Sequence, residues 1–437
     1  MRVLSRARMR PRSVGAIAVA GLAVVAALSS PALGVRTTAS YPLSTKLRLQ
    51  TIRLESGPQE IRVLKLKAGA VPDLAAADTH LPLRKRTSAI SSAAGALAGI
   101  NGDFGTNDGV PVHMLMIDGE LWTTGLQRGD AIAWSADGSV AYLGAPDLHM
   151  QAQRRAHRLF TITTWNAAPD DTAVAAYTAR GGSVMVPPGV ASPVSGDPHW
   201  CAARLAPLSG LTWSSSTKTT ITRRYTVVDQ PEPCPQTPLA VGATDGAVVV
   251  AEKEISGTAN KVAALSVGDR FQIKWKLKGW PGTQDVMGAG DVLVKDGVNV
   301  APGWHSGKPH IFNDNPRTAI GITQGCPDQD PLTPCEMRWM TIDGRQTSTN
   351  WSAGVRMPFL ASQLIKQGSW DAINLDGGGS TTMWVRDTNA AYCQIYPVVP
   401  GCLVNRPAST ATGQERPIRQ AAVVLPSADA GTPSGLG

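Results

Sequence analysis

The chain has 437 residues, of which 43% are hydrophobic, so it can bury a large core in two or three domain-sized units. Its formal net charge is +8, but five arginines and no acidic residue lie in residues 1–34, which leaves 8 − 5 = +3 for the rest. A nearly neutral chain without an evident stripe of Lys and Arg excludes the electrostatic footprint of a nucleic-acid-binding protein.

Residues 1–34 have the layout of a secretory signal peptide. Arginines precede an apolar run from Val14 to Leu28, and the small-residue pattern Ala32-Leu33-Gly34 predicts cleavage near Gly34. The run is short for a transmembrane helix, although an uncleaved signal anchor is the alternative, and no other apolar stretch is long enough to span a bilayer. We therefore expect a secreted, extracellular protein without stable membrane insertion after the signal is removed.

Residues 41–149 and 241–425 have the patterns of a compact, β-rich domain. Alternating apolar residues over 41–67 predict a β-hairpin, and residues 83–97 predict a helix. Apolar positions from Met357 to Ile365 follow the spacing of an amphipathic helix. Asp-Gly dipeptides between apolar runs are the strongest short-range hairpin signal. They lie at Asp118-Gly119, Asp137-Gly138, Asp245-Gly246, Asp296-Gly297 and Asp343-Gly344.

Two segments differ from this pattern. Residues 150–240 are rich in Pro, Ser, Thr and Trp and have weak periodicity, which predicts an inserted or accessory irregular segment. Residues 426–437 are rich in Ser, Gly and Ala, which is typical of a disordered tail.

Six cysteines, an even number in an exported chain, indicate disulfides. Fifteen connectivities are possible for six cysteines, so the pairing is a guess from sequence proximity. The pairs that we expect are Cys326/Cys335, Cys393/Cys402 and Cys201/Cys234. A zinc site is not expected, because the chain has no Cys-x-x-Cys and no histidine at ligand spacing.

The most informative segment runs from Asp371 to Thr382, where an apolar run ends on Asp376 and three glycines and three hydroxyl residues follow. Tandem glycines let the backbone approach a ligand closely, and consecutive N–H groups in such a turn can form an anion-binding nest. Asp376 would then stand at the mouth of the nest. The nest residues are Gly377, Gly378, Gly379, Ser380 and Thr381. The alternative is a Gly-rich hairpin turn followed by a solvated Ser/Thr run.

Polar residues also follow three other apolar runs, in the loops Asn101-Gly102-Asp103-Phe104, Asn315 to Ala319, and Ile342 to Arg345. If the preceding strands share a sheet, these loops would converge on one cleft with the Asp376 loop.

Arg317 suits a bidentate clamp on a phosphate or carboxylate, with a structural ion pair as the alternative. Asp103 could share acid, base or nucleophile roles with Asp376, or cap backbone N–H groups. Asp343 is a site candidate or simply a turn residue. The lone histidines His113 and His310 are interpreted as structural.

These motifs together resemble the phosphodiester glycosidase family, which includes N-acetylglucosamine-1-phosphodiester α-N-acetylglucosaminidases. The resemblance covers roughly 85–145 and 285–425 in the family's order. Its motifs are Asn101-Gly102-Asp103-Phe104, Ile117 to Glu120, Pro316 to Ala319, Asp343-Gly344-Arg345, Asn374 to Thr381, Asn405-Arg406-Pro407 and Glu415-Arg416-Pro417.

The resemblance implies an α+β fold with a mixed β-sheet core, packed helices and β-rich character, interrupted by the irregular insertion. It also implies an exported hydrolase that cleaves the glycosidic bond of a sugar-1-phosphodiester. The catalytic candidates are then Asp376, Asp103 and Asp343, and Asn405 and Arg416 join Asn101, Arg317 and the Gly loop as substrate-binding candidates.

The expected partner is a glycosyl phosphodiester or phosphorylated glycan, not nucleic acid. No cofactor is expected, although Asp-rich loops near a phosphate are compatible with a divalent cation. The oligomeric state does not follow from the sequence.

Two alternatives stay open. One is a non-catalytic extracellular polysaccharide- or cell-wall-binding protein on the same scaffold, which Phe359 favours because the family's helix usually carries a glutamate there. The other is a phosphodiesterase that cleaves the P–O bond instead of the C–O bond.

Overall fold

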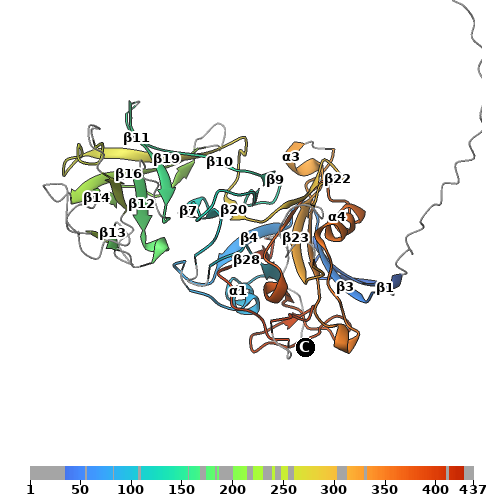
Figure 1. Cartoon of the computed structure of the whole chain (residues 1–437). Helices are drawn as coiled ribbons and strands as arrows, with labels where there is room; N and C mark the ends of the chain where they lie inside the picture. The colour runs from blue at the N-terminus through green and yellow to red at the C-terminus, as the bar shows by residue number, and fades with distance from the viewer. Residues whose placement is uncertain are drawn as a thin grey trace, which may run out of the picture. The chain divides into compact units, whose positions relative to one another are not determined.

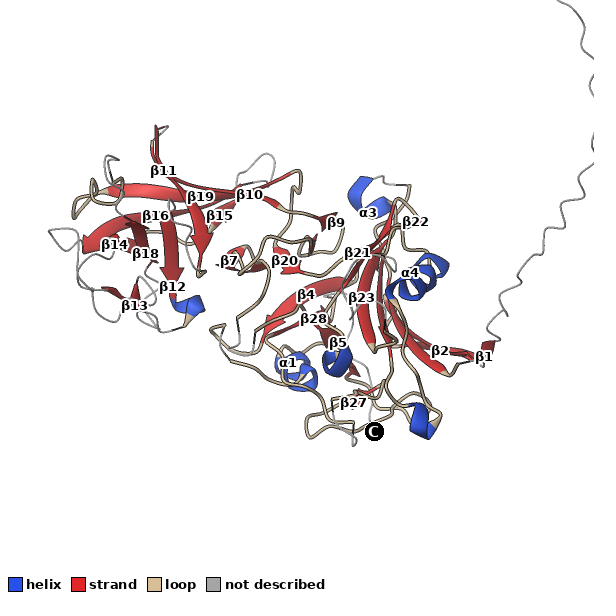
Figure 2. Cartoon of the chain, in the orientation of Figure 1, coloured by secondary structure: helices blue, strands red, loops and turns tan. Residues whose placement is uncertain are grey.

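The computed structural model describes residues 35–427, apart from 55–56, 82, 107–109, 156, 168–173, 183–184, 187–199, 214–219, 230–238, 242–247, 254–259, 303–312, 329–331 and 410–412. Strands hold 47% of the described residues and helices 9%, so this part of the chain is mostly β (Figures 1 and 2). The α+β expectation is therefore correct only in its β-rich part. No helix in the described part of the chain is long and apolar enough to cross a membrane.

One of the two eight-stranded sheets has only antiparallel neighbouring pairs, so the expectation of a mixed sheet is wrong for it. In spatial order it contains β1 (Val35–Pro42), β2 (Leu47–Leu54), β3 (Gln59–Leu66), β24 (Met337–Ile342), β23 (Arg317–Ile322), β25 (Asp371–Asn374), β21 (Val292–Lys295) and β22 (Val298–Asn299). The predicted hairpin over 41–67 is confirmed as β2 and β3, with Leu54 opposite Gln59.

Both faces of this sheet are buried. Along β3, Ile61 and Val63 pack in one hydrophobic cluster and Leu64 and Leu66 in another. The first cluster includes the apolar stripe of α4 (Met357–Lys366), which confirms the amphipathic helix that the spacing predicts. Figure 1 shows α4 beside β22 and β23. Burial on both faces explains the nearly continuous apolar runs of the central strands.

Two five-stranded sheets join chain segments that are far apart in sequence. One contains β27 (Cys402–Leu403), β26 (Met383–Val385), β5 (Ala98–Asn101), β28 (Gln420–Leu425) and β4 (Val71–Ala76), and the other β7 (Glu120–Thr123), β6 (Leu115–Ile117), β20 (Asp285–Gly288), β8 (Ala131–Trp134) and β9 (Ala141–Gly144). The predicted helix over 83–97 is shorter, as α1 (Thr87–Ala93), and its Ile90 packs with Trp384 and Val423 of the first sheet.

The described residues of the segment expected to be irregular form most of a closed β-barrel, which two strands beyond residue 240 complete. Its seven strands close because β14 pairs with both β18 and β16. Around the barrel they are β14 (Trp200–Pro207), β18 (Val248–Lys253), β12 (Val174–Thr178), β11 (His157–Trp165), β10 (Asp147–Arg154), β19 (Arg270–Lys278) and β16 (Thr220–Asp229), with the short β15 (Thr212–Trp213) added to β16. The β13 (Met185–Val186) and β17 (Leu239–Ala240) strands form a separate pair. Only β11 and β12 pair in parallel among the described strands.

Three of the Asp-Gly dipeptides form the predicted hairpin turns. Gly119, Gly138 and Gly297 have φ of 75°, 65° and 73°, and they join β6 to β7, β8 to β9 and β21 to β22. Asp343-Gly344 is not such a turn, because Asp343 is buried at the end of β24 and Gly344 has no positive φ. Asp245-Gly246 lies outside the described residues.

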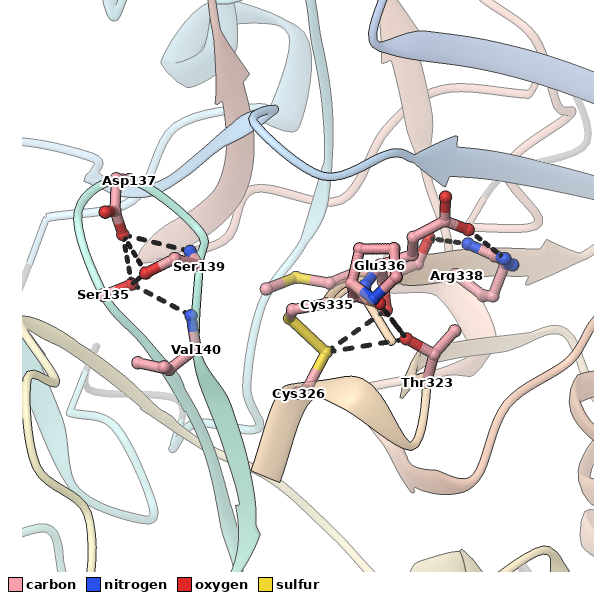
Figure 3. Close-up of a disulfide and its surroundings, with 11 residues drawn as sticks. Ser135, Asp137, Ser139, Val140, Thr323, Cys326, Cys335, Glu336 and Arg338 are labelled. Atoms are coloured by element: carbon pink, nitrogen blue, oxygen red, sulfur yellow. Dashed lines mark hydrogen bonds and ion pairs between the residues drawn. A yellow bond between two sulfur atoms is a disulfide. The ribbon is translucent and has the colours of Figure 1, made fainter. Parts of the chain in front are cut away.

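Two of the three expected disulfides are confirmed, Cys326–Cys335 and Cys393–Cys402. The first joins the one-turn helix α3 (Gly325–Asp328) to the segment before β24, where Thr323 and Glu336 surround it (Figure 3). Cys234, the expected partner of Cys201, lies outside the described residues, as do the signal segment 1–34 and the residues from 428 onward.

Candidate active site around Asp376

Asp376 follows β25, a central strand of the eight-stranded sheet, and lies where several loops meet. The Leu375 N–H donates to the Thr318 carbonyl (2.8 Å) and the Asp376 N–H to the Gly102 carbonyl (3.3 Å). These two bonds join the end of β25 to the start of β23 and to the loop after β5. The sequence analysis expected these segments to lie close together. The loop then forms one 3-10 turn at Gly378–Ser380.

The Asp376 residue is half-buried, and polar groups surround its carboxyl group. Its Oδ2 accepts a hydrogen bond from the Ser380 hydroxyl at 2.6 Å. Burial raises the pKa of Asp376 above its ordinary value, and although Ser380 and Arg416 oppose this, the charge of Asp103 adds to it. A carboxyl group held in this way stays protonated to a higher pH than usual, which suits a group that gives or takes a proton at a reacting centre.

The expected nest of free N–H groups is largely occupied by the protein itself. The Gly378 N–H donates to the Pro316 carbonyl (2.9 Å), and the Ser380 N–H donates to the Gly377 carbonyl (3.1 Å). The Gly377 N–H contributes to lowering the pKa of the Asp376 carboxyl group. Two of the four amides from Gly377 to Ser380 thus donate to carbonyls of the protein, so the backbone alone makes a weak anion site.

Two exposed arginines lie directly over the glycines of this loop. A Cβ on Gly378 would stand 3.3 Å from Arg345 Nη2, and a Cβ on Gly379 would stand 2.6 Å from Arg416 Nη2. The absence of side chains at these positions thus lets two guanidinium groups rest on the loop. Each guanidinium presents several N–H donors in a fixed fork, which is the geometry that binds phosphate.

The Arg345 side chain is anchored to Asn315, whereas Arg416 is held only through its neighbour Glu415. The Asn315 Oδ1 accepts hydrogen bonds from Arg345 Nε (3.0 Å) and Nη2 (2.8 Å). Next to Arg416, the Glu415 carboxylate accepts the backbone N–H of Ser88 in the first turn of α1 at 2.9 Å. Anchored cations lose less side-chain entropy when they bind an anion.

Asp103 forms a pair with His113, which the sequence did not identify as a site residue. The His113 Nδ1 lies 3.0 Å from Asp103 Oδ1, with the His113 side chain 14% exposed and that of Asp103 fully enclosed. The loop folds back through the Val112 N–H to Phe104 carbonyl bond (3.1 Å), and this brings the two residues together. Burial lowers the pKa of His113, but Asp103 and the charge of Asp130 raise it by more.

Arg419 is a third cation near the two carboxylates, and the sequence analysis did not single it out. Its side chain packs flat against Gly105, where any Cβ would collide with the guanidinium. It is 9% exposed, and its Nε has no hydrogen-bond partner among the described residues. Burial lowers the pKa of Arg419, whereas Asp376 and Asp103 raise it, which places its charge beside both carboxylates.

Two predicted site residues, Asn101 and Asn405, are buried in a hydrogen-bond network that contacts the Asp376 loop. Asn101 is fully buried, and its Nδ2 donates to the Asp376 carbonyl (2.7 Å) while its Oδ1 accepts the Thr382 N–H (3.1 Å). Asn405 donates to Asp343 Oδ1 (2.9 Å) and to the Thr381 carbonyl (3.1 Å). These side chains hold the loop from below and do not face a ligand.

Asp343 belongs to the same network. Its Oδ2 accepts the Trp351 Nε1–H at 2.7 Å and the Arg406 N–H at 2.9 Å, and the residue is 1% exposed. Burial raises its pKa, and Arg62 together with these hydrogen bonds opposes the rise. Its contacts assign it to support of the site instead of to chemistry.

Arg317 is also buried, at 4% exposure. Its Nε donates to the Val355 carbonyl (3.0 Å) and its Nη2 to the Asn313 carbonyl (3.0 Å). Burial, together with the charge of Arg345, lowers its pKa to about 10. Of these two arginines, it is therefore Arg345 whose guanidinium is exposed next to the Asp376 loop. In the Asp343-Gly344-Arg345 motif, the sequence analysis had named Asp343 and not Arg345 as the site candidate.

Comparison with known proteins identifies the domain that carries this site. Residues 217–425 match the family model described as phosphodiester glycosidase. The chain therefore carries a phosphodiester glycosidase domain. The matched range contains Arg345, Asp376, Arg416 and Arg419. No curated protein matches the chain.

The chain aligns with solved structures at low sequence identity. A hypothetical protein from Synechocystis has a TM-score of 0.61 at 17% identity, and this chain, covered to 89%, spans 63% of its length. A candidate exported protein from Burkholderia pseudomallei K96243 has a TM-score of 0.55 at 19% identity, over 85% of this chain and 75% of that one. The zebrafish N-acetylglucosamine-1-phosphodiester α-N-acetylglucosaminidase catalytic domain, auto-inhibited by its pro-peptide, aligns at a TM-score of 0.40 and 12% identity, over 89% of this chain and 83% of that one.

A separate group of carboxylates in this chain is the best-placed set for a cation among the described residues. Asp73, Asp118 and Asp285 each offer one oxygen, and these lie within 4.8 Å of one another. Burial raises the pKa of Asp285 well above its ordinary value, and its Oδ1 accepts the Asp118 N–H at 2.9 Å. None of these three residues is among the residues of the site around Asp376.

Proposed function

We propose that the chain is a secreted hydrolase that cleaves the glycosidic C–O bond of a sugar-1-phosphodiester. The observation that carries the proposal is the juxtaposition, on one glycine loop, of a carboxyl group with a raised pKa and two exposed guanidinium groups, of which that of Arg345 is anchored to Asn315. A glycosyl phosphodiester needs both features, because it combines an anomeric carbon with an anionic leaving group. The phosphodiester glycosidase family match supports the same reaction class.

In the proposed mechanism Arg345 and Arg416 hold the phosphate over Gly378 and Gly379. The bond between the anomeric carbon and the phosphate oxygen breaks, and the phosphate leaves with the electron pair. The oxygen of a water molecule joins the anomeric carbon, and its proton passes to a titratable group of the site. Phosphate is a good leaving group, so stabilising its charge contributes more than protonating it.

Asp376 takes the proton of the water that attacks the anomeric carbon, and His113 is the second titratable group of the site. Asp103 is enclosed, so it works through His113 by fixing the ring orientation, as a buried carboxylate commonly does for a histidine. Arg419 lies beside both carboxylates and stabilises them as charge changes during the reaction. Asn101, Asp343, Asn405 and Arg317 position these groups from below.

The test is release of free sugar from a panel of methyl phosphodiesters of N-acetylglucosamine, glucose and mannose 1-phosphate. The wild-type chain should hydrolyse at least one of them. Asp376→Asn should lower kcat by about 10²- to 10⁴-fold, the usual contribution of a general acid or base, while thermal unfolding stays within a few degrees. Near-wild-type activity of Asp376→Asn overturns the assignment of Asp376.

The same panel tests the alternative of a non-catalytic glycan-binding protein. Hydrolysis of no substrate, together with measurable binding to a polysaccharide, would support that alternative and overturn the enzyme proposal.

A further inference from the structure

The outer face of the barrel carries a row of lysines on β19. Lys274, Lys276 and Lys278 alternate with Ile273, Trp275 and Leu277, which are buried in the barrel core. Because successive side chains of a strand point to opposite faces, the three lysines stand in one line at intervals of about 6.8 Å. The row is not evident as a cluster of charges in the sequence, because an apolar residue separates each lysine from the next.

Polar side chains of the neighbouring strands complete the surface. Lys276 lies opposite His149 of β10 and Thr220 of β16, and Lys274 lies opposite Gln151. These residues, with Gln153 and Lys278, line a depression of about 330 Å³. No carboxylate in the described residues lies within ion-pair distance of Lys274 or Lys276, whereas Asp147 lies 3.9 Å from Lys278 and 2.8 Å from His149.

A second depression, of about 610 Å³, continues the first along the same strands and shares Gln153 with it. Its cations are Arg155, Arg224 and Arg270, all exposed. No Asp or Glu lines either depression. We call the two together the β19 groove, and the nine residues of β19 give it a length of about 30 Å.

We propose that the β19 groove binds an anionic glycan polymer that carries phosphodiesters, which is the polymeric form of the substrate of the Asp376 site. This rests on the proposed function. Cations at regular intervals complement an anion that repeats, and the Gln, Thr and His side chains between them can hydrogen-bond sugar hydroxyls.

The groove does not suit single-stranded nucleic acid, because proteins bind it by stacking bases on exposed aromatic rings. The phenyl and phenol rings that line the groove, those of Phe271 and Tyr225, are 5% and 1% exposed. Binding of a phosphate-bearing glycan needs cations and hydrogen-bonding groups, but no exposed aromatic rings for base stacking.

The experiment uses the full chain and yeast phosphomannan, a glycan with mannose 1-phosphodiester branches, as the probe. Binding is measured with Asp376→Asn as the background, so that the polymer is not consumed. The variant K274Q/K276Q/K278Q should lower affinity at least about tenfold at low salt, since each exposed ion pair contributes modestly. It should also make the slope of log K against log salt shallower by about 2, as expected for three lost phosphate contacts.

The matched control is K46Q/K67Q/K366Q, which removes three exposed lysines from the sheets and helix outside the barrel. It should bind like the background. In the otherwise wild-type chain, the groove variant should raise KM for phosphomannan and leave kcat/KM for the small methyl phosphodiester unchanged.

Equal loss in both triple variants would overturn the proposal, because it would reflect net charge alone. Tighter binding of a single-stranded oligonucleotide than of phosphomannan would overturn it as well. If no substrate is hydrolysed, the proposed function fails, but the binding comparison still tests the groove.

Discussion

Gly379→Ala should weaken substrate turnover by displacing Arg416. A Cβ at this position would stand 2.6 Å from Arg416 Nη2 and 3.0 Å from Cζ. Carbon contacts need about 3.5–4.0 Å, so the guanidinium must move by about 1 Å. The backbone itself tolerates alanine, because Gly379 does not have a positive φ.

The size of the effect follows from the bond that Arg416 would make to the phosphate. A hydrogen bond to a charged group contributes about 1.5–3 kcal/mol, which corresponds to a factor of about 10–150. Because Arg416 is exposed, we expect the lower end, a loss of about tenfold in kcat/KM. The free energy of unfolding should change by less than about 1 kcal/mol.

The assay is steady-state hydrolysis of the best methyl phosphodiester, with chemical denaturation as the stability check. Gly210→Ala is the control, since nothing lies within 4 Å of its Cβ position and its φ is not positive. The double variant Gly379→Ala/Arg416→Ala should be no less active than Arg416→Ala, because both changes remove one interaction. Additive losses, or a Gly379→Ala enzyme as active as wild type, would refute the reasoning.

Three further predictions test individual contacts. The pKa of His113 is raised, so its pair with Asp103 stabilises the fold at pH values below the ordinary histidine pKa, and this stabilisation is lost as pH rises through the pKa of the folded state. His113→Gln should therefore lower Tm more at pH 5.5 than at pH 8.5. A larger decrease at pH 8.5 would contradict this. Arg317→Ala should lower the free energy of unfolding by about 2–4 kcal/mol, because it removes the charged hydrogen bonds from a buried guanidinium to the Val355 and Asn313 carbonyls. Chemical denaturation checks this, and a stable variant with only a raised KM would show that Arg317 binds substrate instead. Cys326→Ala/Cys335→Ala should cost roughly 2–3 kcal/mol for its short loop, and an unchanged denaturation midpoint would count against a stabilising role.

Local signals predicted the parts of the fold that depend on near neighbours. The β2–β3 hairpin, the α4 helix, three Asp-Gly turns and two short-loop disulfides each follow from a few adjacent residues. The barrel did not follow, because its closure depends on β14 pairing with β16 and β18, and long segments separate some of its strands. A hairpin turn is encoded locally, but the closure of a barrel is not.

The sequence predicted that loops after several strands would meet near Asp376, and backbone hydrogen bonds join three of these loops. The tandem glycines make the Asp376 loop easy to recognise in the sequence. Arg317 and Arg345 cannot be distinguished there, because only the folded structure shows that Arg317 is buried and Arg345 is exposed. His113 lies in the site because its loop folds back, and Arg419 lies there because it packs against Gly105, so the composition of the sequence could not indicate either residue. The ten-residue separation of Asp103 and His113 across a Gly- and Pro-containing loop was the one available signal.

The most direct test of the central claim is hydrolysis of a glycosyl methyl phosphodiester in water enriched in oxygen-18. Cleavage of the C–O bond places the label on the anomeric carbon of the released sugar and leaves methyl phosphate unlabelled, which is the predicted result. Label in the phosphate would show attack at phosphorus, and it would contradict the role given to Asp376 and the two arginines.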